Sequence, residues 1–138
     1  MAAPPPPKDP EHWLFRLTAE EWLAAADNEL RLCAAALARR AARPAVTLAR
    51  RAAGMAWNAV LAHSPDDRFG RSYMEHVVAL ALDERVPAEV RAAAGVLRDT
   101  APVPPVLVQI GRPEGGHDAP LLAARTVVEH ARRLTTSS

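Results

Sequence analysis

Residues 44–63 limit the possible folds more than any other part of the sequence. Their apolar side chains recur at spacings of three and four, which is the pattern of a helix. Pro44 suits a first helical turn, where the amide hydrogen that it lacks would have no partner. Because polar residues occupy only a narrow strip, we expect a helix over 44–63 that other helices largely enclose. The strip consists of Thr47, Arg50, Arg51, Gly54 and Asn58.

Alanine is the most frequent residue of the chain, and it shapes the fold that we expect. Alanine favours helices but buries little apolar surface, so stability must come from many close contacts between helices. The 138 residues have the length of one domain. The sequence therefore predicts an all-α fold, a four- to five-helix up-down bundle with a short extended segment before the last helix.

Four further helices follow from apolar periodicity and from start signals. Thr18 and Glu21 have the spacing of a capping box, and Pro87 and Pro120 each suit a first turn. Residues 106–110 have the pattern of a short strand and follow prolines that exclude a helix. The expected helices cover 18–40, about 69–83, 87–98 and 120–134, with a proline-rich leader and cap at 1–17, one domain at 18–134 and a disordered tail at 135–138.

The sequence holds no sign of export or of a membrane span. Its start lacks the layout of a signal peptide, and no run of about 18 apolar residues exists. The single cysteine, Cys33, lies on an apolar stripe, which predicts a buried thiol. We therefore expect a cytoplasmic protein without a membrane partner. In the leader, Trp13, Leu14 and Phe15 are expected to cap the bundle or to enter a groove of a partner.

Five histidines raise the question of a metal site, but their spacing does not favour one. Two ligands on one helix face need a spacing of three or four residues, and neither His76 nor His130 has such a partner. The glycine motifs of the commoner phosphate-binding loops are absent as well. We predict neither a bound metal nor a cofactor.

An arginine and a histidine together can cleave RNA without a metal. The histidine exchanges a proton with the 2′-hydroxyl or the leaving oxygen, and the arginine stabilises the charge of the phosphorane. Arg112 and His117 lie in a glycine-rich loop before a helix start, where backbone amides attract anions. They are the first candidates for a catalytic pair, and a connecting loop without function is the alternative.

Two more pairs share the same spacing. Arg71 and His76 flank the start of the third expected helix and are secondary candidates, although His76 could simply pack beside Tyr73. Arg125 and His130 would point in different directions from the last helix, so we interpret them as surface residues.

Five arginines gather where the first two expected helices meet, and no acidic residue occurs between Arg31 and Asp66. The cluster could bind a phosphate backbone, or it could be solvated surface that offsets the negative end of the first helix. It contains no aromatic residue that could stack on bases, which disfavours sequence-specific reading of single strands. The candidate phosphate contacts are Arg39, Arg40, Arg43, Arg50 and Arg51.

Three segments of the chain resemble the HEPN superfamily, a group of small helical domains from nucleotide-binding and RNA-cleaving systems. They are residues 22–30, residues 49–61 and the run 76–80 that leads to 86–90. The resemblance implies a bundle that forms a homodimer and binds RNA or nucleotides. Active members carry their arginine and histidine late in the bundle, at the dimer cleft, which corresponds to Arg112 and His117 by order along the chain. The activity implied is at most that of a metal-independent endoribonuclease.

Two other hypotheses stay open at this point. One is a non-enzymatic dimerisation or adaptor module, which would present Trp13, Phe15 and residues 103–110 to a partner protein. The other is a pocket for a small ligand within the bundle, lined by Trp22, Met55 and Trp57.

Overall fold

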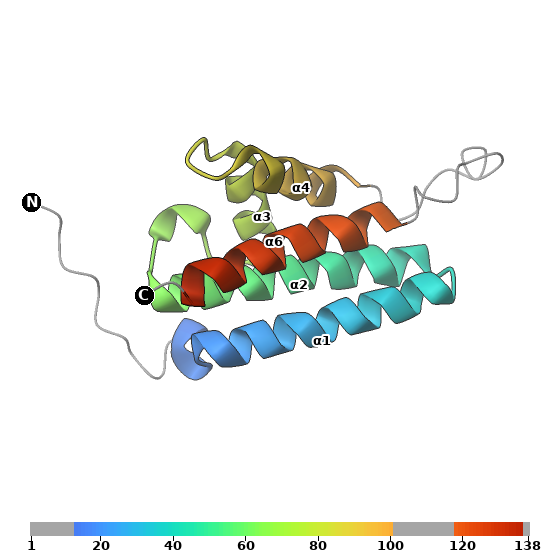
Figure 1. The fold of residues 1–138 in the computed structure, drawn as a ribbon, viewed down its shortest axis with the longest axis horizontal. Coiled ribbons are helices and arrows are strands. Elements are labelled where there is room, and N and C mark those ends of the chain that lie inside the picture. The colour runs from blue at the N-terminus through green and yellow to red at the C-terminus, as the bar shows by residue number, and fades with distance from the viewer. Residues whose placement is uncertain (1–12, 101–117, 137–138) are drawn as a thin grey trace, which may run out of the picture.

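A computed structural model of the chain describes residues 13–100 and 118–136 (Figure 1). In these ranges the structure consists of helices and short 3-10 turns, with no strand, which confirms the predicted all-α bundle. The expected strand at 106–110 lies outside the described residues. The elements are η1 (Trp13–Arg16), α1 (Ala19–Ala38), α2 (Ala42–His63), η2 (Asp67–Phe69), α3 (Tyr73–Leu82), α4 (Ala88–Asp99) and α6 (Ala119–Thr136).

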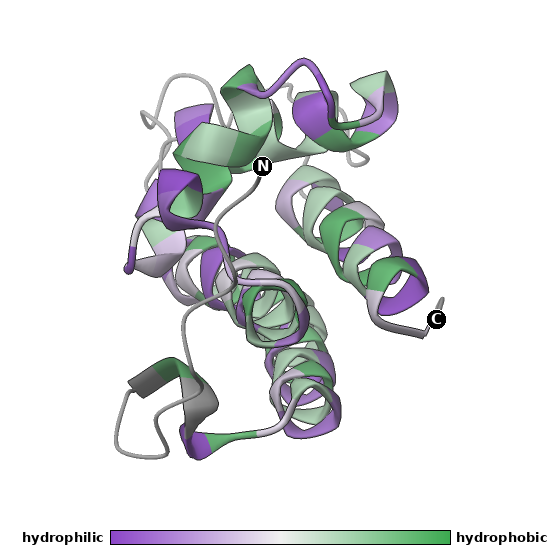
Figure 2. Cartoon of the chain, turned by 90° about the vertical axis from the view of Figure 1, so that its left-hand side faces the viewer, coloured by the Kyte–Doolittle hydropathy of each residue, from purple (hydrophilic) through white to green (hydrophobic). Residues whose placement is uncertain are grey.

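Helix α2 is the axis of the bundle. It forms an antiparallel hairpin with α1, and α6 lies along it and runs in the same direction as α2 (Figure 1). The hairpin of α3 and α4 covers another side, with α3 against α2 and α4 against α6. The view along the bundle in Figure 2 shows that the helices carry both hydrophobic and hydrophilic residues, as amphipathic helices do.

The enclosure of α2 confirms the expectation from its sequence. Met55 and Trp57 are 8% and 3% exposed, and Leu48 packs against the core in a partly buried position. The predicted polar strip is wrong in its second half, because Gly54 and Asn58 are buried. A methyl group on Gly54 would collide with the side chain of Tyr73, so the missing side chain lets α3 approach α2 closely.

Capping boxes fix where α1 and α3 begin. The Thr18 hydroxyl accepts a hydrogen bond from the Glu21 amide at 3.1 Å, and the Glu21 carboxylate accepts one from the Thr18 amide at 2.9 Å, as predicted. Ser72 and Glu75 form a second box of the same kind. This second box corrects the predicted start of α3 from about residue 69 to Tyr73, after the separate turn η2.

The segment before α1 packs onto the bundle. The Leu14 side chain is buried, and the Leu14 carbonyl accepts a hydrogen bond from Trp22 Nε1 at 2.9 Å. This segment therefore contacts the bundle through Leu14 and Trp22. At the other end, α6 extends to Thr136, two residues beyond the predicted limit.

Two residues of the helices have an unusual exposure for their type. Leu82, a large apolar residue of α3, is 68% exposed. Glu29, on the inner side of α1, is buried although it carries a charge. No helix in the described ranges combines the length and the apolarity that a membrane span requires.

Candidate phosphate-binding turn

The turn between α1 and α2 is built on an arginine in a conformation that favours glycine. Arg40 has φ 60°, in the left-handed region. Its amide donates to the Leu37 carbonyl at 2.9 Å, and the Ala41 amide donates to the Ala36 carbonyl at 2.8 Å. These two bonds form a Schellman motif, which satisfies the last carbonyl groups of α1 and turns the chain into α2.

Three arginines of this turn are available to a ligand. Arg39, Arg40 and Arg43 are exposed, and their side chains make no ion pair or hydrogen bond within the described residues. The N-terminus of α2 beside them has no side-chain cap and no acidic residue in its first turn. Helix N-termini carry unpaired amide hydrogens and partial positive charge, which favour bound anions. We call Arg39, Arg40 and Arg43 the arginine turn.

The other two arginines of the predicted cluster have structural roles. Arg50 donates from Nε to the Leu97 carbonyl at 2.7 Å and from Nη2 to the Thr100 carbonyl at 2.8 Å, so it caps the end of α4. Arg51 Nη2 lies 3.1 Å from Oε1 of the buried Glu29. Arg50 and Arg51 therefore each bind groups of the protein itself, whereas Arg39, Arg40 and Arg43 have no such partner in the described residues.

The secondary pair does not form a common site. His76 is completely buried, with Nδ1 2.6 Å from the Phe69 carbonyl and Nε2 2.7 Å from Asn58 Oδ1, whereas Arg71 is exposed. Burial lowers the pKa of His76 below the usual 6.5. A histidine without solvent access cannot exchange a proton with RNA, so the geometry favours the packing role over the catalytic one.

The first candidates, Arg112 and His117, lie outside the described residues. The next residue, Asp118, is exposed at the start of α6. It lines a cavity of about 300 Å³ together with Ala34, Leu37 and Ala38 from the end of α1. The start of α6 therefore lies beside the helix end that leads into the arginine turn (Figure 1).

Arg125 and His130 differ from each other in their surroundings. Arg125 is exposed, as expected for a surface residue. His130 is only partly exposed, and its ring stacks on Trp57 with the centroids 6.1 Å apart. Burial and the charge of Arg133 lower the pKa of His130. The interpretation of His130 as a simple surface residue is therefore wrong, because it covers the central tryptophan of α2.

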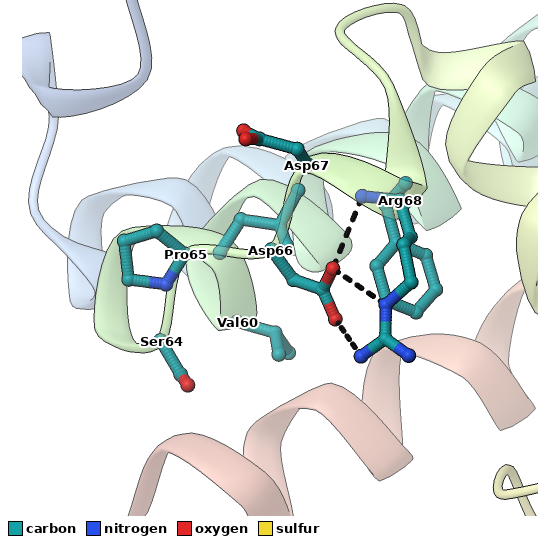
Figure 3. Close-up of a pocket in the computed structure, with 8 residues that line it drawn as sticks. Val60, Ser64, Pro65, Asp66, Asp67 and Arg68 are labelled. Carbon is teal, nitrogen blue, oxygen red and sulfur yellow. Dashed lines mark hydrogen bonds and ion pairs between the residues drawn. The ribbon is translucent and has the colours of Figure 1, made fainter. Parts of the chain in front are cut away.

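A larger cavity, of about 630 Å³, lies at the opposite end of α2 (Figure 3). Two of its charged residues bind each other, because Asp66 accepts hydrogen bonds from Arg68 Nε at 2.9 Å and from Nη2 at 2.7 Å. These bonds hold the pKa of Asp66 below its usual value. The third hypothesis, a pocket around Trp22, Met55 and Trp57, gains no support, since these side chains are buried in the core and line neither cavity.

Cys33 is a core residue. It is fully buried, Sγ donates to the Ala45 carbonyl at 3.2 Å, and burial raises the pKa of the thiol. Within the described residues, no three His, Cys, Asp or Glu side chains gather as a metal site would require.

The residues that sequence reasoning missed are the buried polar ones, Glu29 and Asn58. Each occupies the stripe of its helix that packs on a neighbouring helix. The helical periodicity of that stripe was the only sequence signal of their burial. Comparison of the chain with family models, with curated proteins and with solved structures found no match.

Proposed function

We propose that this chain is a HEPN-like helical domain that binds RNA or nucleotides through their phosphate groups at the arginine turn. One observation carries the proposal. Arg39, Arg40 and Arg43 are exposed and without a side-chain partner in the described part of the chain, beside an uncapped helix N-terminus. Guanidinium groups are well suited to phosphate because they donate two parallel hydrogen bonds.

The expected mode of binding is independent of base sequence. The side chains of the turn are arginines and alanines, which contact phosphates and do not stack on bases. Affinity then comes mainly from the release of counterions and decreases steeply with salt.

The proposed ribonuclease activity requires Arg112 and His117, which lie outside the described residues, to act near the arginine turn. Support comes from Asp118, which directly follows His117 and lies beside the last turn of α1. In this proposal the arginine turn holds the RNA backbone, His117 exchanges the proton of the 2′-hydroxyl, and Arg112 stabilises the phosphorane.

Binding and cleavage are separated by one experiment on a labelled single-stranded RNA, using the whole chain and its His117→Ala variant. We expect both proteins to bind with equal, salt-dependent affinity in fluorescence anisotropy, and only the wild type to cleave. If neither protein cleaves the RNA, the ribonuclease activity is excluded and only the RNA-binding function remains. The absence of salt-dependent binding would refute the proposal as a whole.

An adaptor or dimerisation module is the second candidate, and exposed apolar residues on α3 favour it. Val78 and Leu82 are 37% and 68% exposed and lie one turn apart on the same face. Large apolar side chains on one surface often mark a protein interface. Sedimentation of the wild type and of Leu82→Asp tests this: a dimer that dissociates in the variant supports it, and a monomer in both contradicts a homodimer through α3.

A further inference from the structure

Three polar groups meet in the core where η2 and α3 pack on α2. His76 Nδ1 lies 2.6 Å from the Phe69 carbonyl, and Nε2 lies 2.7 Å from Asn58 Oδ1. His76 and Asn58 are both completely buried. Asn58 Nδ2 is buried as well and has no hydrogen-bond partner within the described residues.

These contacts determine the tautomer of His76. The Phe69 carbonyl can only accept, so Nδ1 carries the hydrogen. In the neutral ring Nε2 is then an acceptor, and it faces the Asn58 oxygen, which is an acceptor too. A half-turn of the Asn58 amide resolves this conflict, because it brings the unpartnered Nδ2 to Nε2 as a donor. The amide therefore donates to neutral His76, and its oxygen accepts only when Nε2 carries a second proton.

A protonated His76 would lack a counter-charge in this site. Glu75, the next residue on α3, is exposed and is the charged side chain whose field reaches the ring. The groups that α2 and η2 present to the ring are the Asn58 amide and the Phe69 carbonyl, and neither titrates. A charged imidazole that is buried without a counter-ion destabilises the packing around it.

We propose that Asn58, His76 and Phe69 form an acid-sensitive latch, in which neutral His76 holds η2 and α3 on α2 and its protonation releases them. Transient opening exposes Nε2 to solvent, where it binds a proton, and the open form becomes favoured because there the imidazolium is hydrated. The latch is independent of the proposed RNA binding, since none of its residues belongs to the arginine turn.

The sign of the pH dependence follows from linkage. The open form takes up a proton near the ordinary pKa of 6.5, whereas the closed form, in which burial lowers the pKa, does so only in more acidic solution. Between these two values the opening constant rises up to about tenfold for each pH unit of acidification, because one proton is taken up. Above pH 6.5 the latch is closed and insensitive to pH.

Nuclear magnetic resonance of the whole chain between pH 8 and pH 4 tests the latch. The ¹⁵N shifts of the His76 ring report its tautomer and charge, and hydrogen exchange reports opening through protection factors, which are corrected for intrinsic rates. We expect the Nδ1–H tautomer at neutral pH. Below pH 6.5 we expect protection to fall in residues 67–82, up to about tenfold per pH unit, while it stays constant in α1.

Two variants complete the test. Asn58→Asp supplies a carboxylate to the imidazolium and should raise the pH at which His76 titrates, which abolishes the acid-dependent loss of protection. His63→Gln, at the exposed end of α2, is the control and should behave like the wild type. The latch is refuted if His76 carries its hydrogen on Nε2, if it titrates like an unfolded histidine, or if acid weakens α1 and α3 equally.

Discussion

Gly54 and Gly95 both lie inside helices, but we expect their substitution by alanine to change stability in opposite directions. A methyl group on Gly54 would collide with Tyr73, whereas one on Gly95 would meet only Arg98 Nη2, 3.9 Å away. We expect Gly54→Ala to lower the free energy of unfolding by about 1–3 kcal/mol through overpacking. Gly95→Ala should raise it by up to about 1 kcal/mol, because alanine favours the helix. Urea denaturation of both variants checks this, and equal effects would contradict the close contact of α2 with α3.

Arg40 has a left-handed backbone conformation that glycine adopts more easily. The left-handed conformation costs a non-glycine residue about 1–2 kcal/mol of folding free energy, and glycine avoids this cost. Glycine also makes the unfolded chain more flexible, which lowers stability by about 0.4–1 kcal/mol. Arg40→Gly should therefore stabilise the protein by about 0.5–1 kcal/mol while it weakens RNA binding. The control is Arg39→Gly, at φ −85°, which should destabilise. A destabilising Arg40→Gly in urea denaturation would show that the turn is held differently.

Helices α1 and α2 are joined by an ion pair in which the carboxylate is buried and the guanidinium is partly exposed. The side chain of Glu29 is 9% exposed and that of Arg51 is 49% exposed, and Glu29 Oε2 has no other partner in the described residues. Arg51→Gln leaves a buried carboxylate without its cation and should cost about 1–3 kcal/mol of unfolding free energy. Glu29→Gln combined with Arg51→Gln should recover most of this loss in thermal denaturation.

The matched control for this pair is Arg43→Gln, an exposed arginine without a side-chain partner in the described ranges. Its effect on stability should stay within about 0.5 kcal/mol. If Arg51→Gln were as mild as the control, the structural role of Arg51 would be wrong and the residue would return to the phosphate contacts.

Helix starts and inner faces could be predicted from the sequence, because capping residues and apolar stripes are local signals. Thr18 and Glu21 identify the start of α1, and the apolar stripes of α4 and α6 identify their inner faces, including Val90, Leu97 and Val128. The partners of the buried polar residues were not predictable, because they lie far along the chain. Asn58 is accommodated in the core by His76, which lies 18 positions away. A strip of polar residues on α2 therefore resembled solvent-facing surface.

The candidate site lies in the part of the sequence, between Arg31 and Asp66, that holds arginines and no acidic residue. The sequence indicated the arginine cluster, since no acid separates its members. It could not indicate which arginines stay available, because Arg50 meets carbonyl groups of α4 and Arg51 meets Glu29 only in the folded chain. Folding thus divides one cluster in the sequence into a structural part and an exposed turn.

The most direct test of the arginine turn is the salt dependence of RNA binding. The variant Arg39→Gln with Arg43→Gln is compared with Arg16→Gln with Arg71→Gln, which removes the same charge from other exposed positions. Each phosphate contact contributes about 0.7 to the slope of log K against log salt for single strands. We expect the turn variant to reduce the slope by about 1.4 and the other variant to leave it unchanged. Equal reductions in both variants, or none in the turn variant, would contradict a phosphate-binding turn.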